Sequence, residues 1–146
     1  MATTKVARLL ETKGSNVWTI APDALVYDAL QTMAEKEVGA LIVTEGRRVV
    51  GIFSERDYAR RVILAGRSSR TSPVREMMTT RVLFVSPDET VDDCMGLMTE
   101  KHVRHLPVME GDRLVGVISI GDVVKAIMSD QRFTIEELEK YISGSG

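Results

Sequence analysis

The sequence has a single cysteine, Cys94, few aromatic residues and no excess of basic over acidic side chains. A lone cysteine cannot form an internal disulfide, which is typical of a reducing compartment. Nineteen Lys and Arg against 21 Asp and Glu leave a formal net charge of −2, so no overall positive field attracts nucleic acid. No apolar run approaches the roughly 20 residues of a membrane helix, and the opening residues lack the continuous apolar segment of a secretion signal. We therefore expect a cytoplasmic protein whose partners include neither nucleic acid nor a membrane.

What the sequence does contain is an internal repeat. When the chain is shifted by 65 positions without a gap, residues 17–63 lie over residues 82–128, and 18 of the 47 aligned positions are identical. Several identical pairs are polar or typical of turns: Pro22/Pro87, Asp23/Asp88, Gly51/Gly116, Ser54/Ser119 and Asp57/Asp122. Each copy alone is too short to bury a comfortable core, so we expect the two to share one domain.

Each copy predicts the element order β-α-β-β-α, and hence an α/β (α+β) fold. In the first copy a strand at 17–20 precedes a helix on which Val26, Ala29 and Met33 lie on one face. Two strands joined by a glycine-containing turn follow at 40–43 and 49–53, and a second helix follows them. We divide the chain into repeat 1 at 6–64, a linker at 65–73, repeat 2 at 74–130, and a C-terminal helix and tail at 131–146.

Finer expectations follow from local patterns. Short helices are predicted at the start of each repeat, at 6–10 and 74–78, and a separate amphipathic helix at 133–142. Thr90 is expected to cap the first helix of repeat 2, whereas in repeat 1 Leu25 cannot cap and Asp23 is expected to take that role. The strand at 49–53 is apolar enough to predict burial on both faces, and the linker is expected at the surface.

This pattern resembles the CBS domain, named after cystathionine beta-synthase. The resemblance rests on the duplicated β-α-β-β-α unit, on Pro-Asp before its first helix, and on Gly-x-x-Ser-x-x-Asp where its last strand enters a helix. The resemblance covers about residues 6–130. The chain is similar to a stand-alone tandem pair of such domains, called a Bateman module. It implies two repeats packed about a pseudo-two-fold axis, with clefts that bind AMP, ADP, ATP, S-adenosylmethionine or NAD. It also implies a homodimer that reports energy or redox state to a regulated protein, whose identity the sequence does not give.

The Ser-x-x-Asp motifs, Ser54 with Asp57 and Ser119 with Asp122, allow two interpretations. One is a capping box, in which the serine and the acid accept hydrogen bonds from backbone N–H groups at the start of the helix. The other is a ligand site, because a carboxylate can accept both hydroxyl protons of a ribose and a helix start favours phosphate. The resemblance implies that these four residues hold ribose. Both interpretations can hold for the same residues.

The repeats differ where further ligand contacts are expected. Gly39-Ala40 corresponds to Arg104-His105, and Arg56 corresponds to Gly121. The resemblance implies phosphate contacts for Arg56, Arg104 and His105; arginine suits phosphate oxygens, and His105 can add charge near neutral pH. It implies that adenine lies mainly against the backbone of a second set, Val38, Gly39, Ala40 and Val103. The alternative for the arginines is an ordinary solvated surface charge.

Two functional hypotheses follow. The first is a non-catalytic sensor of adenosine nucleotides. The alternative is a dimerisation or interaction module with no physiological nucleotide. The sequence contains no nucleophile–base set, glycine-rich phosphate loop or metal cluster, so we predict no catalytic residues, no bound metal and no catalytic cofactor. Cys94 lies on a helix stripe with Met95 and Met98 and is predicted to be buried and inert.

Overall fold

The computed structural model describes residues 4–143 and confirms the predicted α/β fold class. The chain divides into two compact units. The first-repeat unit comprises Val17–Leu83 with Asp112–Leu114, and the second-repeat unit comprises the residues up to Asn16, Phe84–Gly111 and the residues from Val115 onward. Within the described part of the chain, no helix is long and apolar enough to cross a membrane.

The first-repeat unit is built on a three-stranded sheet in the order β1-β2-β3. β1 (Thr19–Ile20) pairs parallel with β2 (Ala40–Glu45), which pairs antiparallel with β3 (Arg48–Ser54) across a tight turn. Gly46 in this turn has a φ of 64°, a left-handed conformation that glycine adopts without steric cost. α2 (Val26–Lys36) packs its apolar stripe into a buried cluster with the sheet: Val26, Ala29, Met33, Leu41, Val43 and Phe53.

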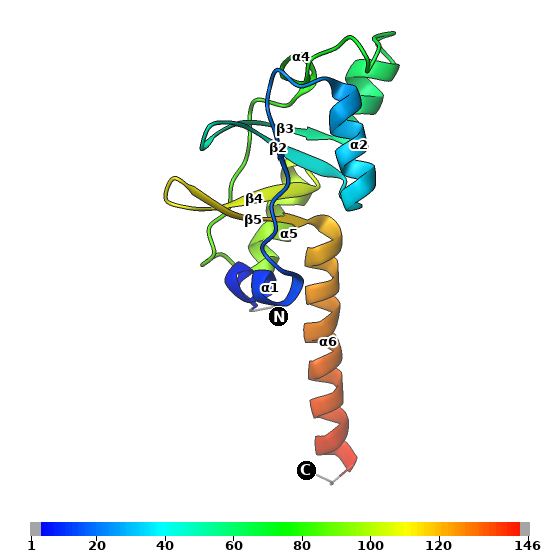
Figure 1. Cartoon of the computed structure of the whole chain (residues 1–146). Coiled ribbons are helices and arrows are strands. Elements are labelled where there is room, and N and C mark those ends of the chain that lie inside the picture. The colour runs from blue at the N-terminus through cyan, green and yellow to red at the C-terminus, as the bar shows by residue number, and fades with distance from the viewer. Residues whose placement is uncertain (1–3, 144–146) are drawn as a thin grey trace. The chain divides into compact units, whose positions relative to one another are not determined.

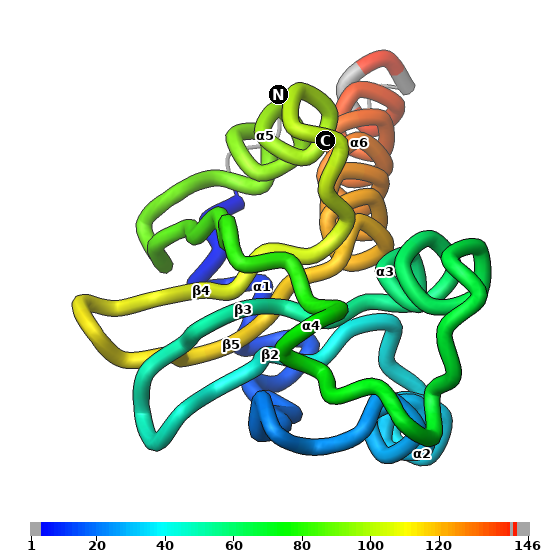
Figure 2. The backbone as a smooth tube through the Cα atoms, turned by 90° about the horizontal axis from the view of Figure 1, so that it is seen from above, coloured from blue at the N-terminus to red at the C-terminus, as the bar shows by residue number. Residues whose placement is uncertain are grey.

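The second-repeat unit repeats this plan with a smaller sheet. β4 (His105–Glu110) pairs with β5 (Arg113–Ser119), and the strand predicted before them is reduced to one parallel bridge between Val85 and Val108. α5 (Val91–Lys101) begins with a capping box between Thr90 and Asp93, as predicted for Thr90. Both hairpins are visible in Figure 2, β2–β3 in blue-green and β4–β5 in yellow.

The two short helices predicted at the starts of the repeats are present, and each packs on the other repeat. We call α1 (Val6–Lys13) and α4 (Val74–Met77) the lead-in helices. α1 belongs to the second-repeat unit, where the Val6 N–H donates to the Glu89 carbonyl at 2.8 Å. α4 belongs to the first-repeat unit, where the Val74 N–H donates to the Ala24 carbonyl at 2.8 Å. The connections therefore cross between the repeats.

The glycines shared by the repeats explain how closely the lead-in segments approach. A Cβ placed on Gly51 would lie 2.6 Å from Met78 Sδ and 2.9 Å from the Thr79 carbonyl oxygen. A Cβ on Gly116 would lie 2.7 Å from a methyl group of Leu10 on α1. These positions need glycine because a neighbouring segment occupies the space of a side chain.

The start of α2 differs from expectation. Asp23 forms an ion pair with Arg75 and does not cap the helix, and Leu25 at the N-cap has no side-chain cap bond. Instead, the first-turn N–H groups of Val26 and Tyr27 donate to the carbonyls of Ser72 and Ser69, both at 2.9 Å. The predicted linker thus supplies the cap, and Ser72 within it is fully buried rather than at the surface.

Three further predictions needed correction. β3 buries Gly51 and Phe53 but leaves the intervening Ile52 partly accessible, so its two faces are not both buried. The second helix of repeat 1 is a short turn, α3 (Glu55–Asp57), that continues as the π-helical segment η1 (Tyr58–Ile63). The predicted separate helix at 133–142 is the far end of one continuous helix, α6 (Ile120–Ser143), because no glycine or proline interrupts it after Gly121.

The close approach at Gly51 yields a matched pair of substitutions. Gly51→Ala should lower the free energy of unfolding by about 1–3 kcal/mol, because the methyl group meets the Thr79 backbone. Gly96→Ala should raise it by about 0.5–1 kcal/mol, since Gly96 lies inside α5 with nothing within 4 Å of the added methyl. Urea denaturation measures both. Equal effects of the two changes would contradict the packing role of Gly51.

Candidate functional site

The first corner, Ser54 with Asp57, lies where β3 enters α3. The Ser54 N–H and Oγ both donate to Asp57 Oδ2 at 3.0 Å, and the Asp57 N–H donates to Ser54 Oγ at 3.2 Å. This is the capping box that the motif allows. The other carboxylate oxygen, Asp57 Oδ1, accepts a hydrogen bond from Thr79 Oγ1 at 3.0 Å. The carboxylate is therefore held between its own helix and the segment that follows α4.

Thr79 is held in place by its backbone. Its N–H and carbonyl exchange two hydrogen bonds of 2.9 Å with Ile52 of β3. Since Thr79 is fixed along β3, its hydroxyl reaches Asp57 without further ordering. A hydroxyl from a ligand could replace it at the same carboxylate oxygen.

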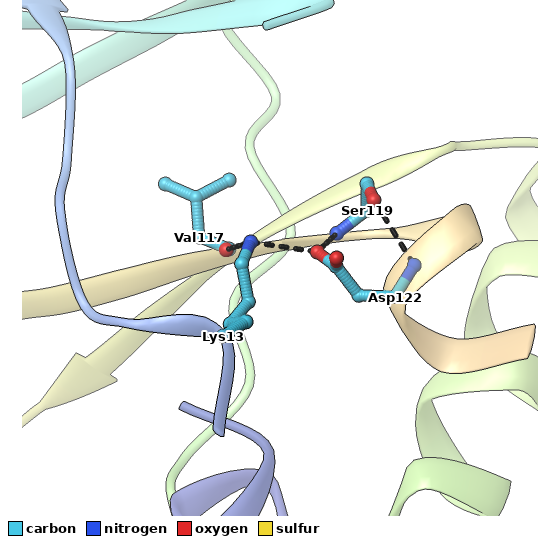
Figure 3. Close-up of polar contacts among 4 residues, drawn as sticks. All are labelled: Lys13, Val117, Ser119 and Asp122. Carbon is cyan, nitrogen blue, oxygen red and sulfur yellow. Dashed lines mark hydrogen bonds and ion pairs between the residues drawn. The ribbon is translucent and has the colours of Figure 1, made fainter. Parts of the chain in front are cut away.

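The second corner, Ser119 with Asp122, repeats the cap at the start of α6. The Ser119 N–H donates to Asp122 Oδ2 at 2.8 Å, and the Asp122 N–H donates to Ser119 Oγ at 3.2 Å. Here the additional partner is charged: Lys13 Nζ, at the end of α1, lies 2.6 Å from Asp122 Oδ2 and donates to the Val117 carbonyl at 2.7 Å (Figure 3). The two corners thus share a cap but differ in the side chain that closes them.

Lys13 and Ser119 together lower the pKa of Asp122. Burial by itself raises the pKa of this carboxyl, but hydrogen bonds from Lys13 and Ser119, together with the lysine charge, outweigh burial and lower the pKa below its ordinary value. Asp122 is therefore ionised at neutral pH. An ionised carboxylate is an acceptor only, which suits hydroxyl donors such as those of a ribose.

The basic residues predicted for the second repeat lie beside this corner. The Arg104 carbonyl accepts the Ile120 N–H at 2.8 Å, which joins the start of β4 to the first residue of α6. His105 interacts electrostatically with Asp122, Lys13 and Arg104. Burial lowers the pKa of His105, and the two cations lower it further against the opposing effect of Asp122. This direction disfavours the expectation that His105 adds positive charge near neutral pH, and its contact with phosphate stays a prediction.

The residues predicted around adenine lie next to the corners through their backbones. The Gly39 carbonyl accepts the Glu55 N–H at 3.1 Å, which places Gly39 and Ala40 at the start of α3. The N–H groups of Val38 and Val103 already donate to the last turns of α2 and α5. Arg56 is exposed on α3. The structure thus brings the predicted residues of each repeat to that repeat's corner, and their contacts with a ligand stay a prediction.

Sequence reasoning missed Lys13 and Thr79. Lys13 ends one lead-in helix and Thr79 lies just after the other. These helices are out of register with the rest of the repeat, so alignment of the two copies did not pair the two residues. Lys13 also lines a groove of about 360 Å³ between α1 and α6, together with Arg8, Asp122 and Lys125. Among residues 4–143, no group of three or more metal-binding side chains gathers.

The lowered pKa of His105 has a consequence for stability. Its ordinary pKa is 6.5, and a lower value in the folded state means that the unfolded chain binds a proton first. The free energy of unfolding should therefore be fully maintained above pH 6.5 and should fall as the pH drops below it. Urea denaturation at pH 7.5 and 5.5 measures this decrease. His105→Gln should reduce it, whereas His102→Gln leaves His105 in place and should keep it; equal pH dependence in both variants would contradict this account.

Comparisons with known proteins agree with the resemblance to the CBS domain. The CBS domain family model matches residues 7–64 and 74–129. The chain is 40% identical over 136 residues to CBSX3 of Arabidopsis thaliana, a mitochondrial CBS domain-containing protein, covering 90% of this chain and 66% of that one. The chain thus spans just under two thirds of this relative. Because that relative is mitochondrial, a cytoplasmic location stays a prediction.

A solved protein with CBS domains from Burkholderia ambifaria MC40-6 is 48% identical, with a TM-score of 0.84 over 88% of this chain and 96% of that chain.

Two other solved structures concern assembly and ligands. A hexameric CBS-CP12 protein from bloom-forming cyanobacteria is 30% identical, with a TM-score of 0.74 over 85% of this chain and 71% of that one. The CBS domain pair of MJ0100, in complex with 5′-methylthioadenosine and S-adenosyl-L-methionine, is 22% identical, with a TM-score of 0.75 over 87% of this chain and 98% of that one. The latter likeness concerns the fold alone. With both repeats matched by the family model, this chain is a member of the CBS-domain family that carries two CBS domains in tandem.

Proposed function

We propose that this protein is a non-catalytic regulator that binds an adenosine nucleotide, AMP, ADP, ATP or NAD, at its two Ser-x-x-Asp corners. As a homodimer in the cytoplasm it would report energy or redox state to a regulated protein. The observation that carries the proposal is the geometry of the two aspartates. Each is fixed at a helix start by its serine, and each is met by one polar side chain: Thr79, just after α4, or Lys13, at the end of α1.

This geometry supports ribose binding for a chemical reason. The 2′ and 3′ hydroxyls of a ribose are adjacent donors, and an ionised carboxylate accepts two such donors at once. Because the serine cap already fixes each aspartate, little side-chain entropy is lost when the ligand binds. The proposal concerns binding and signalling; no catalytic role is assigned to either corner.

The two aspartates are met by different side chains, Thr79 and Lys13, which supports different ligands at the two corners. A ribose hydroxyl at Asp57 has only to displace the hydroxyl of Thr79, whereas one at Asp122 has to share the carboxylate with the Lys13 ammonium. Once displaced, Lys13 offers a cation beside the ribose, with Arg104 on the same unit as a second one. We therefore assign the phosphorylated ligand to the second corner and expect the first corner to depend less on phosphate.

The test is isothermal titration calorimetry with AMP, ATP and NAD on the native chain. Asp57→Asn and Asp122→Asn should each weaken one site by about ten- to hundredfold, because a hydrogen bond to a charged group is lost. Asp92→Asn, on the exposed surface of α5, should bind like the native protein. Absence of heat with all three nucleotides would sink the proposal.

Lys13→Met tests the assignment of the phosphate. The variant should bind AMP more weakly, and adenosine no more weakly than the native chain, since the lysine no longer competes for Asp122. The ratio of AMP to adenosine affinity at this site should fall on the order of tenfold. Thr79→Val is the matched control, because it removes the side chain that closes the first corner. The ratio of AMP to adenosine affinity at the first corner should stay nearly unchanged. An unaltered ratio in Lys13→Met would rule out a phosphate contact at Lys13.

The alternative, an interaction module without a physiological nucleotide, is favoured by one observation. The far end of α6 exposes several large apolar side chains, among them Phe133, Ile135 and Leu138. Such a surface serves association whether or not the corners are filled. A regulated protein that associates equally with and without nucleotide would favour this alternative.

A further inference from the structure

The far end of α6 has no partner in its own unit. Every described side chain from Gln131 to Lys140 is exposed, and this end of the helix extends well past α1 and α5 of the same unit (Figure 1). An isolated polar helix end would be unremarkable, but this one carries large apolar residues. A long exposed helix with an apolar stripe gains stability by burying that stripe against another surface.

The apolar residues form a stripe with the spacing of a helix–helix contact. Met128, Ile135 and Ile142 recur every seven residues, and Leu138 lies three after Ile135. These four side chains are between 55% and 83% exposed. At 1.5 Å per residue the stripe is about 21 Å long. We call these four residues the α6 stripe; their alternating spacing of seven, three and four is that of the seam between paired helices.

The charges beside the stripe indicate how a partner would lie. Arg132 and Glu139 both flank the stripe on the same side, seven residues apart, and both are exposed. When two copies of this helix run antiparallel with Ile135 opposite Leu138, Arg132 of each copy faces Glu139 of the other. In a parallel pair, Arg132 would instead face Ile127 of the other copy, and Glu139 would face Thr134. In the antiparallel orientation the centre of the stripe, Ile135 with Leu138, and the charges beside it are thus complementary to a second copy.

We infer that the α6 stripe is a self-association surface on which a second copy of this chain packs its own α6 in antiparallel orientation. This gives the homodimer of the proposed function a specific surface, and it is independent of nucleotide binding. The isologous arrangement buries Ile135 and Leu138 at its centre and forms two Arg132–Glu139 ion pairs related by a two-fold axis. Phe133 lies on the opposite face of the helix and stays outside the contact.

Sedimentation equilibrium of the full chain tests the apolar part of the contact. Leu138→Glu should raise the dissociation constant of an association step by at least about tenfold, because a charge at the centre of the contact is buried without a partner. Phe133→Glu is the matched control, since it makes an apolar-to-acid change of the same kind on the opposite face and should leave association as in the native chain. Native association by Leu138→Glu, or dissociation caused by Phe133→Glu, would overturn the inference.

Charge reversal tests the orientation. Arg132→Glu and Glu139→Arg should each weaken association, by roughly fivefold, because like charges then face each other. The double variant should recover native association. Failure of the double variant to recover, or insensitivity of association to all three changes, would overturn the antiparallel contact. Calorimetry with AMP on Leu138→Glu should match the native chain, so that loss of this contact and loss of nucleotide binding are read separately.

Discussion

At Gly51 and Gly116 the backbone of a strand lies against a segment from outside its repeat, with no space for a methyl group. Leu10 of α1 rests on Gly116, and the residues that follow α4 rest on Gly51. This contact sets the position of Lys13 and of Thr79, which in turn close the two corners. Gly51 and Gly116 are therefore packing residues, and the geometry of each aspartate depends on them indirectly.

The capping and ligand interpretations of Ser-x-x-Asp do not exclude each other. Ser54 and its aspartate use one carboxylate oxygen for the cap, while the other oxygen meets Thr79. The cap supplies a rigid base, and the closing side chain occupies the part of the carboxylate that a ligand would use. A corner that is closed by the protein's own side chain keeps a partly buried carboxylate satisfied.

The sequence predicted the parts of the fold that depend on local pattern or on the repeat itself. The stripe of Val26 and Met33, the cap at Thr90 and the paired serines and aspartates were all visible in it. It did not reveal what depends on contacts between distant segments. Ser72 caps α2 across the chain, and Lys13 reaches Asp122 from 109 residues away. The lowered pKa of His105 likewise follows from burial and from the charge of Lys13, which no local pattern contains.

The crossing of the lead-in helices gives the two units different histories during synthesis. Nearly all of the first-repeat unit is one continuous stretch, so its core can form as soon as that stretch leaves the ribosome. The second-repeat unit needs α1, yet Gly116, on which Leu10 rests, is made about 5–20 s later at ordinary rates of translation. During that interval Leu10 and its apolar neighbours on α1 lack the surface that buries them in the folded protein. Among the described helices, α1 is thus made first yet is among the last to be buried, so its apolar residues need the protection that chaperones provide while the remainder is made.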